Sequence, residues 1–281
     1  MIKHRLINGT VMIALLVGAL FLPALGVFLI IPVLAAMMMY EFYGMMDQAG
    51  LRNYRHVGAI GGLVLILATA GNYLVYGGVS VYQWEGLVLA GIVMAVLLRQ
   101  LFEKDDAQPL VTLSVTWLGV LYIAFIFNFY TKLLLQWPEG DGRLVLFYMI
   151  LIVKVTDMAA YFTGCSIGRH KLIPRVSPAK TWEGCAGGVV GGMATSLLFW
   201  WLTGGTIGPL HLNIADALVL GILLSVTGIV GDLIESMFKR AAAVKDSGGL
   251  LKGMGGVLDV LDSLLFAAPV LYVYIILCLA P

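Results

Sequence analysis

Residues 236–262 read SMFKRAAAVKDSGGLLKGMGGVLDVLD and lie between two apolar runs, at 214–237 and 260–280. The stretch holds four basic side chains, three carboxylates and five glycines. Carboxylates can bind a hard cation, lysine and arginine can bind phosphate, and glycines let the backbone approach a ligand closely. The pattern therefore indicates phosphoryl or nucleotidyl transfer at a membrane surface.

The composition is that of an integral membrane protein. Of the 281 residues, 60% are hydrophobic and 12% are charged, whereas a soluble domain has about 45–50% apolar and about 25% charged residues. The net charge is only +1, so we expect no nucleic-acid partner. Cys165, Cys185 and Cys278 have no metal-ligand spacing, and we expect them to be packing residues.

Apolar runs long enough to span a lipid bilayer recur along almost the whole chain. The fold class is therefore predicted to be an all-α polytopic membrane protein with about nine transmembrane helices. The expected spans are 6–22, 25–45, 57–76, 86–102, 110–130, 144–164, 184–204, 214–237 and 260–280. Apolar character resumes after Pro23, which favours a retained pair of helices over a cleaved leader.

The placement of charge predicts a cytoplasmic N-terminus and an outside C-terminus. With nine spans, the cytoplasmic segments hold 14 of the 17 basic residues and the outside segments hold Lys132 and Arg143. Lys154 falls within a span. This bias agrees with the positive-inside rule, and it places both richly polar loops, 165–183 and 238–259, in the cytoplasm.

Two regions are expected along the chain. Residues 1–135 would form the N-terminal transmembrane helices, as a bundle or oligomer scaffold. Residues 136–281 would form the catalytic transmembrane region, with the loops 165–183 and 238–259. The sequence leaves the oligomeric state open, a homodimer included.

Charged side chains inside spans suggest function, because each costs roughly 2.5–3.5 kcal/mol on insertion scales. Lys154 and Asp157 lie three residues apart, on one helix face. They are either a mutually neutralising pair or part of a hydrated cavity open to the cytoplasm. Near the end of the 214–237 run, offsets of three and four align one polar stripe: Asp232, Glu235, Ser236, Lys239 and Arg240. A solvated helix end would explain the two basic residues but not Asp232, which lies well inside the apolar stretch.

Asp259 and Asp262 share a face at the start of the last span. Capping of the helix explains one such carboxylate. Two carboxylates, with Asp232 opposite, suit Mg²⁺, which takes one or two carboxylates and completes its shell with water and substrate phosphate. Asp246 could serve the metal or the substrate, and spacing alone does not decide between them.

The loop before the seventh expected span also carries candidate phosphate ligands. Ser177 and Thr181 are candidate helix-start residues, and a helix N-terminus favours anions. Lys180 could meet a phosphate as a point charge. The alternative is a positive-inside anchor with Trp182 at the interface, and His170 is expected to be a solvated loop residue.

Together these residues resemble a known family, the phosphatidate cytidylyltransferases or CDP-diacylglycerol synthases. The matching positions of the long signature are Ser236, Phe238, Lys239, Arg240, Lys245, Asp246, Gly248, Gly255, Gly256, Asp259 and Asp262. Two further segments resemble the same family, DMAAYFTG at 157–164 and SPAKTWEG at 177–184. The first half of the chain resembles it only as a hydrophobic bundle.

The resemblance implies transfer of a cytidylyl group from CTP to phosphatidic acid, giving CDP-diacylglycerol and pyrophosphate with Mg²⁺. A second cation is left open. The implied metal ligands are Asp232, Asp259 and Asp262, and the implied catalytic residues are Asp232, Asp246, Asp259, Lys239 and Lys245. The implied substrate-binding residues are Ser177, Lys180, Thr181, Ser236, Arg240 and Asp157. The site would face the cytoplasm from the bacterial inner membrane.

Three positions depart from the family pattern. Met254 stands where the family usually has histidine, Val260 where it has arginine, and Lys252 where it has a small residue or proline. Either the missing roles are dispensable, or Lys252 and other basic residues take them, or the activity is altered. A CTP-dependent polyprenol or phytol kinase is a near alternative. An ion-coupled secondary transporter using Lys154, Asp157 and Asp232 is a more distant one, which has no need of the glycine-rich basic loop.

Overall fold

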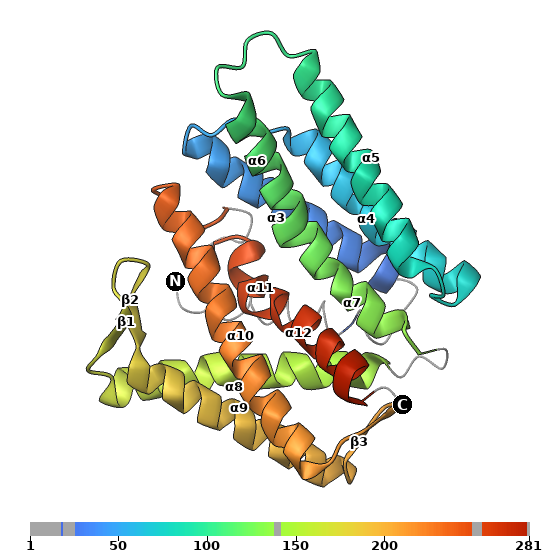
Figure 1. Cartoon of the computed structure of the whole chain (residues 1–281). Helices are drawn as coiled ribbons and strands as arrows, with labels where there is room; N and C mark the ends of the chain where they lie inside the picture. The colour runs from blue at the N-terminus through green and yellow to red at the C-terminus, as the bar shows by residue number, and fades with distance from the viewer. Residues whose placement is uncertain (1–17, 19–25, 138–141, 249–254, 280–281) are drawn as a thin grey trace. The chain divides into compact units, whose positions relative to one another are not determined.

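A computed structural model of the chain describes Gly18 and residues 26–137, 142–248 and 255–279. These residues include eight helical segments that are long and apolar enough to cross a membrane (Figure 1). They correspond to the last eight of the nine expected spans, so the all-α polytopic fold class is confirmed. The first expected span, 6–22, lies outside the described residues except for Gly18. A helix over this span, and the sides of the membrane on which the termini lie, therefore stay predictions.

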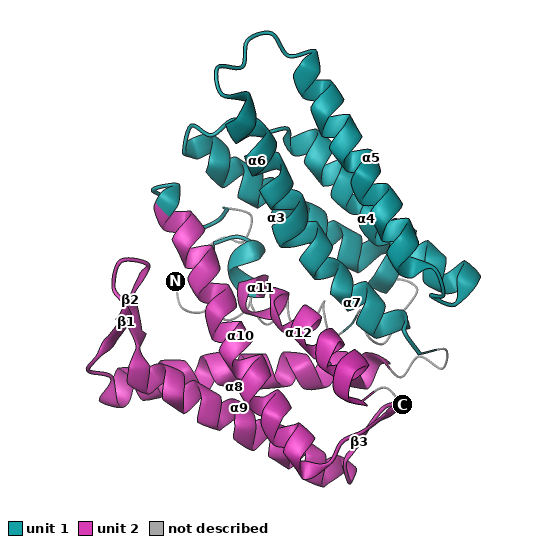
Figure 2. Ribbon diagram, in the orientation of Figure 1, with its two compact units in different colours: residues 1–138, 241–260 teal, residues 139–240, 261–281 magenta. Residues whose placement is uncertain are grey.

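The chain divides into two compact units, coloured separately in Figure 2. Unit 1 comprises residues 1–138 and 241–260, and unit 2 comprises residues 139–240 and 261–281. The expected division at 135/136 was a division of function, which compactness does not test. It therefore stays a prediction.

Unit 1 is a bundle whose helices follow one another in short connections. Its elements are η1 Gly26–Ile30, α3 Ile31–Gln48, α4 Arg55–Tyr76, α5 Val81–Leu101, α6 Pro109–Gly119, η2 Val120–Phe125 and α7 Ile126–Leu135. Helix α4 packs against α3, α5, α7 and η2. It ends where Gly77 adopts a φ of 60°, the left-handed conformation that closes many helices. Helix α6 begins at Pro109. The first N–H groups of a helix have no acceptor within the helix, so the N–H that proline lacks costs no hydrogen bond.

A buried polar network joins three helices of unit 1. Lys132 on α7 is 2% exposed and its Nζ lies 2.8 Å from Glu85 Oε2 on α5. Asn128 Nδ2 donates to Glu85 Oε1 at 2.7 Å and to Thr69 Oγ1 at 2.8 Å. Lys132 was expected to follow the span, but the helix continues to Leu135, with the Glu85 carboxylate offsetting the lysine charge. The side of the membrane on which this helix end lies stays a prediction.

Unit 2 is built on two helices in close contact, α8 Gly142–Ile167 and α9 Trp182–Thr203. Gly184, Gly188 and Gly192 recur every fourth residue on α9 and face α8. A Cβ at Gly184 would lie 2.9 Å from the carbonyl oxygen of Ala160, and one at Gly188 would lie 3.0 Å from the Ala160 Cβ. Small residues at this spacing let transmembrane helices approach closely, since association in lipid depends on packing.

The connection between α8 and α9 is a β-hairpin of β1 Lys171–Ile173 and β2 Ser177–Thr181. Glu183 closes its base by accepting the backbone N–H groups of Arg169 and His170. The His170 ring lies 2.5 Å from the same carboxylate, so this exposed histidine is a paired residue rather than a merely solvated one. The sequence did not predict this hairpin. A second short hairpin, β3 Thr206–Ile207 and β4 Leu210–His211, leads into the next helix.

The last elements are α10 Ile214–Ala241, α11 Leu258–Leu265, α12 Ala267–Tyr274 and η3 Ile275–Leu279. Within unit 2, α10 approaches the segment of α11 that carries Asp262. A Cβ at Gly231 would overlap the carbonyl oxygen of Asp262, and one at Gly228 would lie 3.6 Å from the carbonyl oxygen of Ser263. The glycine before Asp232 thus brings the backbones of α10 and α11 together at the polar end of the span.

Candidate active site

A cavity of about 400 Å³ opens within unit 2 among α8, β2, α9 and α10. Asp157, Ser177, Lys180, Thr181 and Asp232 all line it. Cavities of this size hold small molecules. The structure therefore brings together four of the six expected substrate-binding residues and one expected metal ligand.

Lys180 connects the hairpin to α10 at this cavity. Its Nζ lies 2.8 Å from Asp232 Oδ2 and donates to the carbonyl oxygen of Ile229 at 3.1 Å. The pair is partly exposed, so its net contribution to stability is about 1 kcal/mol or less. Such a cation is available to an incoming anion, because little is lost when it exchanges a carboxylate for a phosphate.

Thr181 and Ser177 have different roles. Thr181 is the N-cap of α9, and its Oγ1 accepts from the backbone N–H of Gly184 at 3.1 Å. This confirms Thr181 as a helix-start residue. Ser177 begins β2 instead, so its assignment to a helix start is wrong. Both residues line the cavity together with Gly184, which places the first turn of α9 against it.

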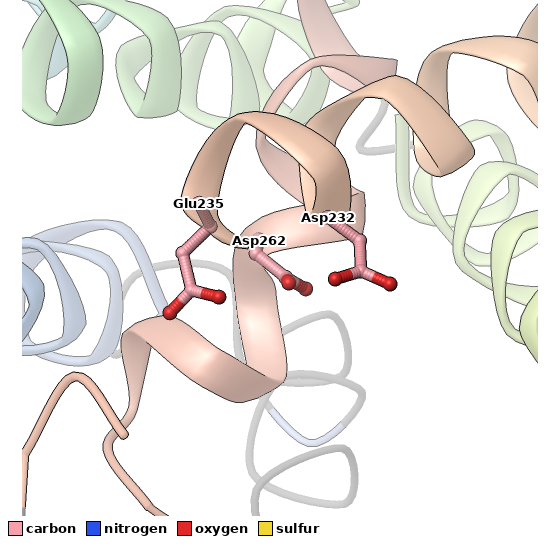
Figure 3. A group of neighbouring side chains, drawn as sticks. All are labelled: Asp232, Glu235 and Asp262. Carbon is pink, nitrogen blue, oxygen red and sulfur yellow. The ribbon is translucent and has the colours of Figure 1, made fainter. Parts of the chain in front are cut away.

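Three carboxylates gather beside this cavity, at the meeting of α10 and α11. Asp232, Glu235 and Asp262 each offer an oxygen atom, and these atoms lie within 4.8 Å of one another. Figure 3 shows the three side chains directed to the same side, two from α10 and one from α11. Gly231 makes this convergence possible by letting the two backbones meet.

The charges around this cluster fit a bound cation. Asp232 pairs with Lys180, and Glu235 pairs with Lys239. Asp262 is 6% exposed and has no basic side chain within 4 Å in the part of the chain that the structure describes. A buried carboxylate without an ion pair is costly, and a donor set made only of carboxylate oxygens suits a hard divalent ion.

Lys154, Asp157 and Ser263 form a second polar group in unit 2. Lys154 Nζ lies 3.3 Å from Asp157 Oδ2 and donates to Ser263 Oγ at 3.0 Å. Ser263 Oγ in turn donates to Asp157 Oδ2 at 3.0 Å. The expected pair of Lys154 and Asp157 is therefore present, and Ser263, which the sequence reading left out, bonds to both. Asp157 also lines the cavity.

The remaining signature residues of α10 surround the carboxylates. Ser236 Oγ donates to Asp232 Oδ1 at 3.3 Å. Arg240 Nε donates to the carbonyl oxygen of Val176 at 3.3 Å, so it holds the hairpin tip to the end of α10. The polar stripe predicted from the spacing is confirmed, since these side chains share one face of the helix.

The other expected residues lie in unit 1. Lys245 and Asp246 are exposed on the segment that follows α10. Asp259 Oδ2 accepts from the backbone N–H of Ser247 at 2.9 Å, from Ser247 Oγ at 2.7 Å and from the backbone N–H of Gly256 at 2.6 Å. One oxygen of Asp259 therefore organises this loop. The prediction that Asp232 and Asp259 share one ion concerns two units, and it stays a prediction.

Two buried carboxylates, Glu235 in unit 2 and Glu41 in unit 1, were given no site role by the sequence reading. Glu235 was placed on the polar stripe but was not expected to be a metal ligand. Glu41 on α3 was not singled out at all, although it is buried within a span. The rule that a charged residue inside a span marks a function would have found it.

Of the three positions that depart from the family pattern, Val260 is among the described residues. Val260 is buried on α11, so an arginine at this position would have to displace packed neighbours. Met254 and Lys252 lie outside the described residues.

The chain is similar in sequence to a known enzyme family and to several known proteins. Residues 3–278 match the cytidylyltransferase family. A phosphatidate cytidylyltransferase of Haemophilus influenzae is 32% identical over 288 residues, which cover 96% of this chain and 96% of that protein. One of Bacillus subtilis is 36% identical over 185 residues, which cover 66% of this chain and 64% of that protein.

A third relative, from Escherichia coli, is named uncharacterized protein YnbB. It is 39% identical over 184 residues, which cover 64% of this chain and 59% of that protein. The aligned region thus spans less than two thirds of the length of the Escherichia coli and Bacillus subtilis proteins.

Proposed function

The chain belongs to the cytidylyltransferase family, and from this premise we propose that it transfers a cytidylyl group from CTP to phosphatidic acid. The products are CDP-diacylglycerol and pyrophosphate. The observation that carries the proposal is the placement of a three-carboxylate cluster beside a cavity lined by Lys180 and Asp232. Nucleotidyl transfer needs this combination of cation-binding oxygens and phosphate-binding cations.

The reaction is a substitution at the α-phosphorus of CTP. A phosphate oxygen of phosphatidic acid attacks that phosphorus, and the bond to the β-phosphate oxygen breaks, so pyrophosphate leaves with the electron pair. The attacking oxygen is already anionic, so little general-base work is required of the chain. The main obstacle is repulsion between two polyanions, which fixed positive charge and correct alignment overcome.

Residues of this chain supply part of that charge. Lys180 reaches the cavity from β2 and can exchange Asp232 for a substrate phosphate. The first turn of α9 offers an N-terminal dipole at the same cavity. Ser177, Ser236 and Arg240 are proposed to bind substrate beside them, and Asp157 to hold Lys154 in place.

Asp232, Glu235 and Asp262 would hold a divalent ion, and we propose Mg²⁺. When bound, such an ion supplies charge neutralisation on the phosphate oxygens. Asp259 is retained as a further candidate ligand, and Asp246, Lys239 and Lys245 as candidate catalytic residues. Lys239 holds Glu235, which orients one carboxylate of the cluster.

We place the reaction at the cytoplasmic face of the bacterial inner membrane. CTP is a soluble nucleotide, and the basic loops at 165–183 and 238–259 lie on the predicted cytoplasmic side. The acyl chains of phosphatidic acid would stay in the bilayer while the headgroup reaches the cavity.

The proposal is tested with purified protein, Mg²⁺ and phosphatidic acid in detergent micelles. CTP is labelled at the α-phosphorus in one reaction and at the γ-phosphorus in another. We expect α-label to enter the lipid extract and γ-label to leave in water-soluble pyrophosphate. A matched reaction with diacylglycerol in place of phosphatidic acid should give no labelled lipid.

Two results would refute the proposal. Transfer of γ-label to a lipid alcohol would identify a CTP-dependent kinase. No label in any lipid, despite folded protein and Mg²⁺, would contradict a transferase of either kind.

A further inference from the structure

Glu41 lies on α3, 6% exposed, and its carboxylate reaches a distant part of unit 1. Oε1 accepts from the backbone N–H of Val257 at 2.9 Å, and Oε2 accepts from that of Leu258 at 2.8 Å. These groups lie at the start of α11, where the first N–H groups of a helix have no partner within the helix. Glu41 therefore caps α11 from more than 200 residues away.

The described residues before α11, Ser247 and Gly248 on one stretch and Gly256 on the next, lie against this carboxylate. A Cβ at Gly248 would lie 2.7 Å from Glu41 Oε1, and one at Gly256 would overlap Glu41 Oε2. A side chain at either position would push the Glu41 carboxylate away from the backbone N–H groups that it accepts from, because the backbone passes directly against that carboxylate. The glycines of the signature thus have a physical reason in this fold.

Asp259 contacts two of the same described residues. Its Oδ2 accepts from Gly256 and from both donors of Ser247. Ser247 Oγ lies 2.7 Å from Asp259 and 3.5 Å from Glu41. Two carboxylates from different parts of the sequence therefore hold Ser247, Gly256 and the first turn of α11.

We propose that Glu41 is a positioning residue for Asp262, the carboxylate that α11 contributes to the proposed metal site. Asp262 follows Leu258 by about one helical turn on the same helix. Fixing the first turn of α11 therefore fixes the direction in which Asp262 leaves the helix. The inference rests on the proposed function in one respect: it takes the carboxylate cluster to be a divalent-cation site.

The test uses the full chain in detergent and reads Mg²⁺ binding from the melting temperature, with no nucleotide present. Mg²⁺ that binds the folded state raises the melting temperature, so a titration gives the half-saturating concentration. For Glu41→Gln we expect this concentration to rise roughly 10-fold to 100-fold, as for other residues that orient metal ligands. The amide still accepts one hydrogen bond but presents an N–H₂ group to a backbone donor.

The matched control is Glu85→Gln, which also changes a buried glutamate of unit 1, 5% exposed, away from α11. This variant should lower the melting temperature but leave the half-saturating Mg²⁺ concentration unchanged. A merely structural role of Glu41 predicts the same behaviour for both variants. Should Glu41→Gln fail to accumulate, Glu41→Asp keeps the charge on a shorter side chain, and a smaller shift in the same direction is expected.

A second readout is tryptic cleavage after Lys245, which is exposed on the loop that Glu41 holds. Glu41→Gln should be cleaved there faster than the wild type, and Glu85→Gln should not. Mg²⁺ half-saturation within twofold of the wild type in the Glu41 variants, or a wild type without any Mg²⁺-dependent shift, would overturn the inference. A wild type that binds Mg²⁺ but transfers no cytidylyl group would refute the proposed function alone.

Discussion

Asp232→Asn is expected to lower kcat roughly 10³-fold while the protein still folds into the membrane. A catalytic divalent ion contributes several kcal/mol of charge stabilisation in the transition state, and each 1.4 kcal/mol is about a factor of ten in rate. Asparagine keeps the shape of the side chain but removes its negative charge, which contributes to the carboxylate cluster and pairs with Lys180. The measurement is the initial rate of CDP-diacylglycerol formation at saturating CTP and phosphatidic acid.

The control for this variant lies on the same helix. Asp216 is in the first turn of α10, where it accepts from the backbone N–H of Asn213 at 2.9 Å and from the Tyr274 hydroxyl at 2.8 Å. Asp216→Asn should cost about 1 kcal/mol of stability, as the loss of a cap does, with kcat unchanged. A loss of less than tenfold in Asp232→Asn would show that its carboxylate is not needed for catalysis.

Lys180→Met is expected to lower kcat/KM for CTP about 10²-fold. Removing a fixed donor to a developing phosphate charge costs 10²–10³ in comparable sites. Methionine preserves much of the apolar stem, so the fold should survive, because the partly exposed pair with Asp232 contributes little to stability. The measurement is the dependence of initial rate on CTP concentration.

A neighbouring lysine on the same hairpin serves as the control for this loss. Lys171 is exposed on β1, does not line the cavity, and has the same charge. Lys171→Met should behave like the wild type if the effect at Lys180 is local. An equal loss of kcat/KM in both variants would mean that the hairpin acts through its overall positive charge. The proposal of a specific role for Lys180 would then be wrong.

Much of the fold follows from local properties of the sequence. Nine spans were predicted because about twenty consecutive apolar residues can only cross a bilayer as a helix, and the eight that fall within the described residues are helices there. Lys132 was misplaced by the same reasoning, since its helix continues through a charged residue whose partner, Glu85, lies 47 residues away. The hydropathy of a segment depends only on its own residues, so it does not reveal a neutralising partner on another helix.

Part of the site was predictable as well, because its residues repeat at helical spacing. Offsets of three and four aligned the stripe on α10, and the motif around Lys180 placed a cation before α9. That Glu235 lies in the carboxylate cluster could not be predicted, because the cluster also needs Asp262 from a second helix. The cap that Glu41 provides needed a contact between residues 216 positions apart, which no periodicity contains.

The most direct test of the account is a change of metal preference at the carboxylate cluster. In a chain whose three native cysteines are alanine, Asp232→Cys replaces a hard oxygen ligand with a soft thiolate, which prefers Cd²⁺ to Mg²⁺. The native cysteines are removed because Cys165 and Cys185 line the cavity and would bind Cd²⁺ themselves. Asp157→Cys, at the same cavity but outside the cluster, is the control.

We predict that Asp232→Cys is inactive with Mg²⁺ and regains cytidylyl transfer with Cd²⁺, whereas Asp157→Cys gains nothing from Cd²⁺. The same substitution at Asp259 would show whether that residue is also a ligand. An Asp232→Cys enzyme that is as active with Mg²⁺ as its cysteine-free parent would contradict the claim that the cluster holds the catalytic ion.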